Sequence, residues 1–205
     1  MSNLDLRGSL SFICQQGEKG FIVPLSEGLL RDKELLKEIR DWRNNNLRFF
    51  FSQSVSTVAT TTTYLKQVLN DPAHSFFLLI TETGKSAGHL GYIKISDSTY
   101  ELDNLVRGNF TLPRDFIECA ERALLVHLFG ECGAQSVILK VFSSNILAKR
   151  IHESLGFQIV RQDKFKKIVD KFNDVKFVAI EEDNQEATFV QTLELNRRRF
   201  LSFNQ

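Results

Sequence analysis

The sequence predicts an α/β protein with a mixed sheet, and two observations carry this prediction. Apolar residues recur at helical spacing in four segments, near residues 28–44, 64–69, 114–129 and 146–155. Between and before these segments lie short apolar or alternating stretches typical of strands, at residues 20–25, 76–81, 86–95, 99–107 and 137–142. Helices and strands therefore alternate along most of the chain.

Composition limits the class of protein further. The chain has 205 residues, of which 42% are hydrophobic and 25% charged, and only 3 are proline. These values exclude collagen-like, low-complexity and wholly disordered proteins. The 26 basic residues nearly balance the 25 acidic ones, so no overall basic field indicates a nucleic acid or a membrane surface as partner. The 18 phenylalanines favour an aromatic core.

The first helix and the first hairpin follow from local patterns. Leu29, Leu35, Leu36, Ile39 and Trp42 recur at helical spacing and predict one amphipathic helix over residues 28–44. Residues 76–81 and 86–95 flank a Thr-Gly-Lys turn, so we expect these two strands to pair as a hairpin.

In the next strand, 99–107, side chains alternate between two faces. Strict alternation places Glu101, Asp103, Leu105 and Arg107 on one partly acidic face. A helix over 114–129 follows, then a buried strand at 137–142 and a helix that ends before Gly156.

The last part of the chain predicts a further hairpin. Residues 175–180 and 187–195 are strand-like and flank an acidic turn at 181–183. No stretch is biased enough in composition to be a linker. We therefore expect one domain, 1–205, in which residues 160–205 form C-terminal strands.

The cysteines and histidines indicate no metal site, because their spacing along the chain is not that of ligand pairs. Cys14, Cys119 and Cys132 are far apart and odd in number, which favours reduced thiols. No apolar run approaches the length of a membrane-spanning helix, and the N-terminus lacks the pattern of a secretory signal. We expect a cytoplasmic protein that binds neither membranes nor nucleic acid.

One segment resembles a known family. Asn145, Ala148 and the run from Glu153 to Phe157, read as Glu-x-Leu-Gly-Phe, are similar to a signature of the GNAT acyl-CoA N-acyltransferases. Residues 49–157 match that family in order. The Trp42-Arg43-Asn44 element resembles the subgroup that contains ribosomal-protein and bacterial amino-sugar N-acetyltransferases. The resemblance implies a mixed, mostly antiparallel twisted sheet flanked by helices, with a splayed parallel strand pair.

The resemblance also implies acetyl-CoA as cofactor and a place for it. Its pantetheine arm would pair with the strands that splay apart, and its pyrophosphate would lie at the start of the helix near Pro113. The glycines of the family's phosphate loop are missing here, so Arg107 or Arg114 would reach the phosphates instead. The implied cofactor-binding residues are Leu105, Val106, Arg107, Arg114, Asp115, Phe116, Asn145 and Ala148.

Acyl transfer to an amine needs a base, a stabilised oxyanion and an acid. Glu101 and Asp103 lie where the family places its catalytic carboxylate, and a backbone N–H near Leu105 would polarise the thioester carbonyl. His152 stands where the family commonly has a tyrosine acid, and a histidine can supply that proton. The alternative for His152 is simple packing.

The predicted function is direct acetyl transfer, without metal, to a primary amine. Similarity to the subgroup favours a small-molecule acceptor, a nucleotide-linked amino sugar first of all. Two alternatives stay open, a protein N-terminal acetyltransferase and a non-catalytic binding module with a GNAT-like fold. A homodimer also stays open as the assembled form.

Overall fold

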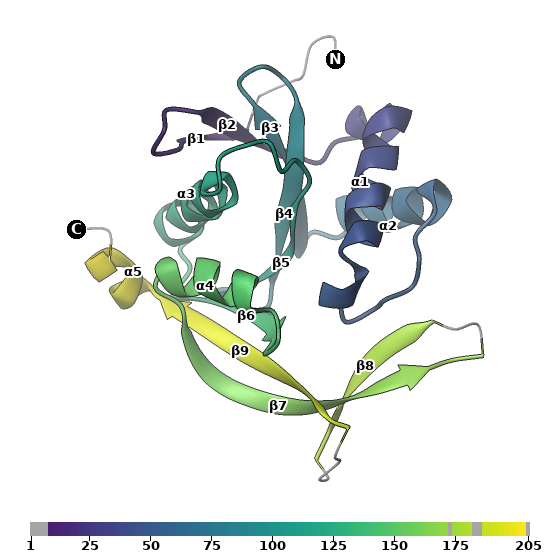
Figure 1. Cartoon of the computed structure of the whole chain (residues 1–205). Helices are drawn as coiled ribbons and strands as arrows, with labels where there is room; N and C mark the ends of the chain where they lie inside the picture. Colours follow the sequence, from purple (N-terminus) through teal and green to yellow (C-terminus); the bar gives the residue numbers. More distant parts are fainter. Residues whose placement is uncertain (1–7, 172–173, 182–185, 204–205) are drawn as a thin grey trace.

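The computed structural model describes residues 8–171, 174–181 and 186–203. A nine-stranded sheet runs through it in the order β1-β2-β3-β4-β5-β6-β9-β7-β8 (Figure 1). Neighbouring strands are antiparallel except β5 and β6, which are parallel. The strands are β1 (Leu10–Ile13), β2 (Lys19–Pro24), β3 (His74–Thr81), β4 (Ser86–Lys94), β5 (Thr99–Arg107), β6 (Ser136–Phe142), β7 (Gln158–Val169), β8 (Val175–Ile180) and β9 (Thr188–Asn196). The architecture implied by the GNAT resemblance is confirmed.

Helices cover both faces of the strands β2 to β6. One layer is formed by α1 (Lys33–Asn45) and α2 (Val58–Asn70), with the short 3-10 helices η1 (Leu29–Arg31) and η2 (Leu47–Phe49) beside α1. The opposite layer is formed by α3 (Phe116–Gly130) and α4 (Ile146–Ser154) (Figure 1). A last helix, α5 (Arg197–Phe203), packs Phe200 against Phe129 of α3.

Two cores result from strand alternation. On β3, Phe76, Leu78 and Ile80 point into the core beneath α1 and α2. Phe77 and Leu79, the residues between them, face the core beneath α3 and α4. Successive side chains of a strand point to opposite faces, so a continuous apolar run fits a strand that is covered on both sides.

The first helix begins later than the apolar pattern predicts. Residues 29–31 form η1, and α1 starts at Lys33, because the Asp32 carboxylate accepts the N–H groups of Glu34 and Leu35. Such an N-cap satisfies backbone donors that the first helical turn leaves without partners. Likewise α3 begins at Phe116 rather than at residue 114.

The prediction of a C-terminal hairpin between residues 175–180 and 187–195 is wrong. β9 pairs with β6 and β7, and β8 pairs with the other edge of β7. The strand between them, β7, escaped the sequence pattern because most of its residues are exposed, so apolar and polar residues do not alternate along it with period two. The acidic turn at 181–183 lies largely outside the described residues.

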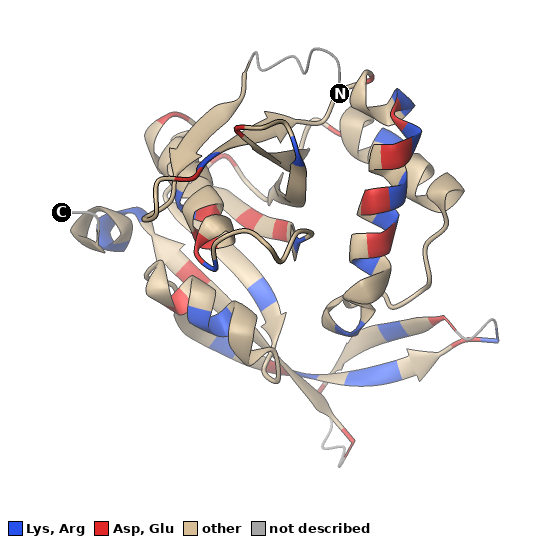
Figure 2. Ribbon diagram, turned by 45° about the horizontal axis from the view of Figure 1, so that its top comes forward, with Lys and Arg blue, Asp and Glu red and all other residues tan. Residues whose placement is uncertain are grey.

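Basic residues follow the β7–β8 arm, as the blue segments of the ribbon in Figure 2 show. Its inner face packs against Phe51, which contacts Phe142 and Phe165 at ring-centroid distances of 4.8 and 5.9 Å. Backbone hydrogen bonds from Gln53 N–H to the Val175 carbonyl and from Phe177 N–H to the Phe51 carbonyl complete the contact. The arm is thus fixed to the segment that joins α1 and α2.

The Trp42-Arg43-Asn44 element holds the α1 layer in place. Asn44 exchanges two hydrogen bonds of 2.9 Å with the backbone of Ser56, and Arg43 donates to the Ser52 carbonyl and the Ser56 hydroxyl. Trp42 lies against Gly108, which follows β5 directly. These three residues therefore tie α1 to the loop before α2 and to the end of β5.

No helix of the described residues is long and apolar enough to cross a membrane.

Replacing Gly108 by alanine tests the Trp42 contact. A Cβ atom at position 108 would lie 2.2 Å from Cε2 of the indole, which cannot move without disturbing the layer. We expect Gly108→Ala to lower the free energy of unfolding in urea by about 1–3 kcal/mol. Gly130→Ala is the control, because nothing lies within 4 Å of its added Cβ. Equal stability of the two variants would contradict the contact.

Candidate active site

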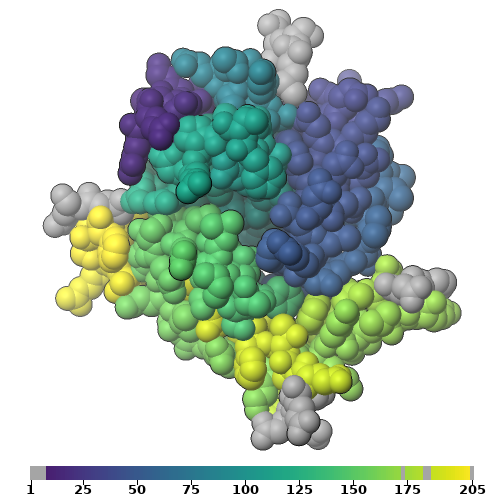
Figure 3. Space-filling model, in the orientation of Figure 1, coloured from purple at the N-terminus to yellow at the C-terminus, as the bar shows by residue number. Residues whose placement is uncertain are grey.

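β5 and β6 separate after three paired residues. Thr99, Tyr100 and Glu101 pair with Ser136, Val137 and Ile138, and no later pair joins the two strands, both of which are fully described. Residues 102–107 thus have β4 as a neighbour on one edge and a gap on the other. Unpaired backbone groups in a gap can hydrogen-bond to a ligand that carries its own amides. In Figure 3 the teal strands lie deep between the green α4 and the blue α1 layer.

A β-bulge interrupts the pairing of β4 with β5. Gly91 of β4 pairs with Asp103 and His89 pairs with Val106, so β5 has one residue more than β4 over this stretch. Asn104 takes up the extra residue with a φ of 55°, a conformation that asparagine adopts more readily than most residues. The bulge bends the strand where the gap opens.

Because of the bulge, the side chains of β5 do not all lie on the faces that strict alternation predicts. Glu101 and Asp103 lie on the face toward α1 and α2, opposite Ile93 and Gly91. After Asn104 the alternation shifts by one, so Leu105 packs into the core beneath α3 instead of sharing the acidic face. Strict alternation across 99–107 was therefore wrong from Asn104 onward.

His89 fixes the carbonyl of the bulge. Its Nδ1 lies 2.6 Å from the Asn104 oxygen, and since a carbonyl only accepts, Nδ1 carries the proton and donates. Burial lowers the pKa of His89 from 6.5 to about 4, so the ring is neutral at pH 7. The imidazole of His89 packs against the aromatic rings of Phe76 and Trp42, with ring-centroid distances of 4.8 and 6.1 Å.

A polar cluster surrounds Asp103 on the α1–α2 side. The carboxylate accepts from the backbone and side-chain N–H groups of Asn104, and His74 Nε2 lies 3.5 Å from Oδ2. Asn104 also donates to the Tyr64 hydroxyl at 2.7 Å. Burial, with the Asp103 charge, raises the pKa of Tyr64 to about 12, so its hydroxyl stays protonated. Asp103 remains partly open, with 39% of its side chain exposed.

Glu101, the other predicted base, has a different environment. Both of its carboxylate oxygens lie 3.0–3.1 Å from Nζ of Lys140 on β6. This ion pair stands at the last paired residue of β5, where the gap begins. The carboxylate of Glu101 is therefore already held by a cation, whereas that of Asp103 has hydrogen-bond donors around it.

The opposite end of the gap leads to the start of α3. The N–H groups of Ile117 and Glu118 have no acceptor among the described residues, as expected for a first helical turn. Arg114 is exposed and has no hydrogen-bond or ion-pair partner in the described ranges. Free donors, the helix dipole and a cation together suit an anion.

Arg107, one of the two arginines predicted to reach the phosphates, binds the loop that precedes α3. Its guanidinium donates to the carbonyl of Leu112 at 2.6 Å and to that of Asn109 at 3.2 Å. Burial and the nearby charge of Arg114 lower its pKa. The side chain thereby fixes the loop before α3 in place of the missing glycines.

Asp115 and Phe116 turn their side chains away from the gap. The Asp115 carboxylate accepts from the backbone N–H of Gln15 at 3.1 Å, in the turn between β1 and β2. Phe116 is 1% exposed and packs edge-on against Phe12, with ring centroids 4.9 Å apart. The backbone of these two residues is what remains available to an anion at the helix start.

The signature segment forms α4. Asn145 caps the helix by accepting the N–H of Ala148 at 3.3 Å, which leaves its Nδ2 group available. Ala148 is half-buried against the core beneath α3. The small side chain and the capping amide together border the gap side of the helix.

His152 of α4 pairs with a residue that the sequence did not single out. Its Nδ1 lies 2.8 Å from Oε1 of Glu121 on α3, and their side chains are 7% and 2% exposed. Glu121 Oε2 has no hydrogen-bond partner, and no partner of His152 Nε2 occurs in the described part of the chain. The pair joins α3 to α4 and leaves one nitrogen of the imidazole free.

Sequence reasoning missed Glu121, Tyr64 and His74 as neighbours of the site. An acidic residue within the apolar arc of 114–129 is a signal that could have pointed to Glu121, because carboxylates are almost never fully buried without a partner. The others lie on separate elements, and no local pattern connects them.

The chain matches known proteins in sequence and in fold. A family model described as acetyltransferase (GNAT) domain matches residues 31–175. The chain belongs to this GNAT acetyltransferase family. Its members use acetyl-CoA, and the protein is an acetyl-CoA-dependent N-acetyltransferase. The alternative of a non-catalytic binding module is therefore not retained.

Solved structures confirm the fold of this GNAT enzyme. A spermidine N-acetyltransferase from Vibrio cholerae, in complex with CoA and spermine, has a TM-score of 0.66 at 16% identity, covering 89% of this chain and 98% of that one. A GNAT-family acetyltransferase from Bacillus anthracis has a TM-score of 0.62 at 19% identity, covering 91% and 99%. No curated protein matches the sequence.

The low pKa of His89 predicts acid sensitivity. Below its ordinary pKa of 6.5 the unfolded chain binds a proton that the folded protein refuses down to pH about 4, so stability falls over this window. From pH 6.5 to about 5 the loss is about 2 kcal/mol. We expect urea unfolding of the wild-type chain at these two pH values to show this loss. The variant His89→Asn, which keeps a hydrogen-bond donor for the Asn104 carbonyl, should show a smaller loss. His127→Asn, in a half-buried surface pair, should leave it unchanged; an equal loss in His89→Asn would contradict the assignment.

Proposed function

We propose that this enzyme acetylates a small cationic primary amine, whose ammonium group binds at Asp103. The observation that carries the proposal is the place of this carboxylate. It is partly exposed, it directly precedes the bulge of β5, and it faces the α1–α2 side beside the unpaired edge of residues 102–107. Tyr64, His74 and Asn104 add hydrogen-bonding groups around it. An ammonium group suits such a site.

The residues at the gap fit acetyl-CoA. When bound, acetyl-CoA supplies the acetyl group as an activated thioester. The backbone of residues 105–107 would pair with its amides, and the free N–H groups of Ile117 and Glu118, with Arg114, would hold its phosphates. Asn145 Nδ2 and the small side chain of Ala148 would border its other side.

The chain's own groups provide the proton chemistry. Asp103, with His74 3.5 Å away, receives the proton that the ammonium group loses before attack. A backbone N–H at Leu105 stabilises the developing oxyanion. The Glu121 carboxylate, 2.8 Å from Nδ1, orients the imidazole of His152, whose Nε2 is the atom that would donate the proton as general acid.

An acidic acceptor is the second candidate. Arg43 donates to the Ser52 carbonyl, and Lys176 of β8 pairs with Ser52 through an isolated bridge. The backbone of Lys176 thus lies beside the segment that Arg43 binds, and the second compound class to compare is an acceptor that also carries phosphate, such as a nucleotide-linked amino sugar. A protein N-terminus is the third acceptor to compare.

The acceptor is tested by coupling release of the CoA thiol to a chromogenic disulfide. The panel contains spermidine, a nucleotide-linked amino sugar and a short peptide with a free N-terminus. We expect the highest kcat/KM with spermidine. A clear preference for either of the other two would overturn the cationic acceptor and leave the acetyl-CoA site untouched.

Asp103→Asn tests the binding site of the amine. It removes the charge that receives the ammonium group and the proton, so we expect kcat/KM for the amine to fall at least about 100-fold. The shift in melting temperature caused by acetyl-CoA should stay the same, because Asp103 faces the α1–α2 side. Asp97→Asn, at a fully exposed carboxylate of the β4–β5 turn, is the matched control. Unchanged kcat/KM in Asp103→Asn would contradict the proposal.

His152→Gln separates catalysis from packing. Loss of a general acid lowers kcat by about 100-fold or more, while KM for the amine should change little. Glu121→Gln, which keeps a hydrogen-bonding side chain but removes the charge, should lower kcat less. If His152→Gln lowers only the melting temperature and kcat stays at the wild-type value, the pair is a packing feature.

A further inference from the structure

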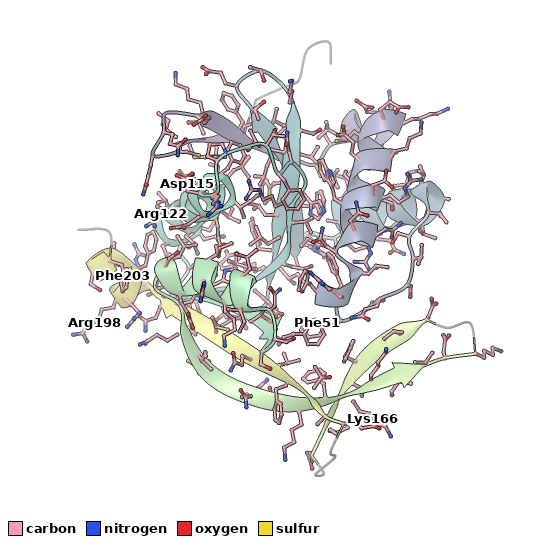
Figure 4. All side chains as sticks on the ribbon, in the orientation of Figure 1. Phe51, Asp115, Arg122, Lys166, Arg198 and Phe203 are labelled. Carbon is pink, nitrogen blue, oxygen red and sulfur yellow. The ribbon has the colours of Figure 1, made fainter. Side chains whose placement is uncertain are left out.

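Two cysteines far apart in the sequence meet at the start of α3. Cys14 is the first residue after β1, in the turn of the β1–β2 hairpin, and Cys119 lies on the first turn of α3. Asp115 lies one helical turn before Cys119. The two Sγ atoms and a carboxylate oxygen of Asp115 all lie within 4.8 Å of one another. Figure 4 shows Asp115 at the end of α3 that faces this hairpin.

The distances suit one tetrahedral ion. Cys119 Sγ lies 3.7 Å from Oδ2 of Asp115. Zinc bonds of about 2.3 Å to sulfur and about 2.0 Å to oxygen, at a tetrahedral angle, separate the two ligand atoms by about 3.5 Å. The observed separation is close to this edge of a zinc coordination tetrahedron, and Cys14 Sγ lies within 4.8 Å of the other two ligand atoms.

Backbone hydrogen bonds hold these groups in position. Cys14 N–H donates to the Glu18 carbonyl at 2.8 Å, and its own carbonyl accepts from Gly17 N–H at 3.0 Å, so the turn is closed. Gln15 N–H donates to Oδ2 of Asp115 at 3.1 Å. Such a bond orients a carboxylate ligand in the way that outer-shell partners do in metal sites.

The Asp115 carboxylate has no other structural task in its own helix. It occupies the N-cap position of α3, yet its side chain caps none of the free N–H groups there. Instead it is directed at the thiols and at the hairpin. An aspartate that leaves its helix uncapped in order to face two cysteines indicates a use for the three groups together.

We propose that Cys14, Cys119 and Asp115 bind a zinc ion, with solvent as the fourth ligand. Cys14 is 4% exposed, while Cys119 and Asp115 are half-buried, which leaves one side open to water. Loading replaces the two thiol protons by two Zn–S bonds, so two protons pass to solvent and no redox partner is needed. The ion fixes the β1–β2 hairpin to the helix end that carries the free N–H groups.

The predicted absence of a metal site rested on spacing along the chain, which cannot show this cluster. A disulfide between Cys14 and Cys119 is the competing use of the pair. A disulfide would leave unused the Asp115 carboxylate, a group of the kind that binds zinc, although it lies within 4.8 Å of both sulfur atoms.

The experiment measures zinc binding by the full chain. The protein is kept in a thiol-free reductant, stripped with a chelator, and titrated with Zn²⁺ against a chromophoric competitor. A parallel titration with Co²⁺ follows the thiolate-to-cobalt absorption band. We expect one equivalent per chain, the cobalt–thiolate band, and a rise in melting temperature on loading.

Variants decide whether these three residues are the ligands. Cys119→Ser and Asp115→Asn should each weaken zinc binding more than about 100-fold, since even loss of an outer-shell partner costs about 10–100-fold. Asp115→Asn keeps size and a hydrogen-bond acceptor at a half-buried position, so it tests the site where a cysteine variant folds poorly. Cys132→Ser is the matched control, because its thiol lies 3.3 Å from His127 Nε2 at the other end of α3.

The proposal is overturned by any of three results. These are no zinc uptake by the wild-type chain, equal affinity in wild type and Asp115→Asn, or loss of binding in Cys132→Ser. A Cys14–Cys119 disulfide that forms in oxidised buffer, while reduced protein takes up no zinc, would assign the pair to the competing use.

Discussion

The separation of β5 from β6 is the constraint on which the rest of the molecule depends. Two parallel strands that begin as hydrogen-bonded neighbours at Thr99–Glu101 diverge within the sheet, and their backbone groups then need other partners. The bulge at Asn104 bends β5 at this point, and the Glu101–Lys140 ion pair stands where the divergence begins. Every group assigned to catalysis borders this gap or supports one that does.

The gap is kept open by interactions that are polar on one side and aromatic on the other. His89 holds the Asn104 carbonyl while its ring packs between Phe76 and Trp42. The indole of Trp42 in turn fills the space over Gly108. Burial strengthens the hydrogen bond from His89 to the Asn104 carbonyl, since no water competes for the carbonyl oxygen. The bulge therefore depends on the neutral form of His89.

On the opposite side a buried carboxylate and an imidazole connect two helices across the same gap. Burying a carboxylate costs desolvation, so a buried pair of this kind is by itself weak evidence for stability. It joins α3 to α4, and one imidazole nitrogen is left without a protein partner in the described part of the chain. The phenylalanine-rich core supplies the packing, as the Phe12–Phe116 and Phe129–Phe200 contacts show.

The sequence by itself determined most of the helices and strands before β7 and indicated the family. The strand 99–107 and the helices predicted near residues 28–44, 64–69, 114–129 and 146–155 follow from local periodicity, because such patterns involve residues close together in the chain. Tertiary structure decided the features that depend on contacts between residues far apart in the sequence. The bulge at Asn104 shifted Leu105 off the acidic face, β7 inserted itself between β8 and β9, and Arg107 became a tether of the loop before α3. Glu121 and His152, and likewise Cys14 and Cys119, lie on separate elements, and only the folded chain brings the first pair to 2.8 Å and the sulfur atoms of the second within 4.8 Å.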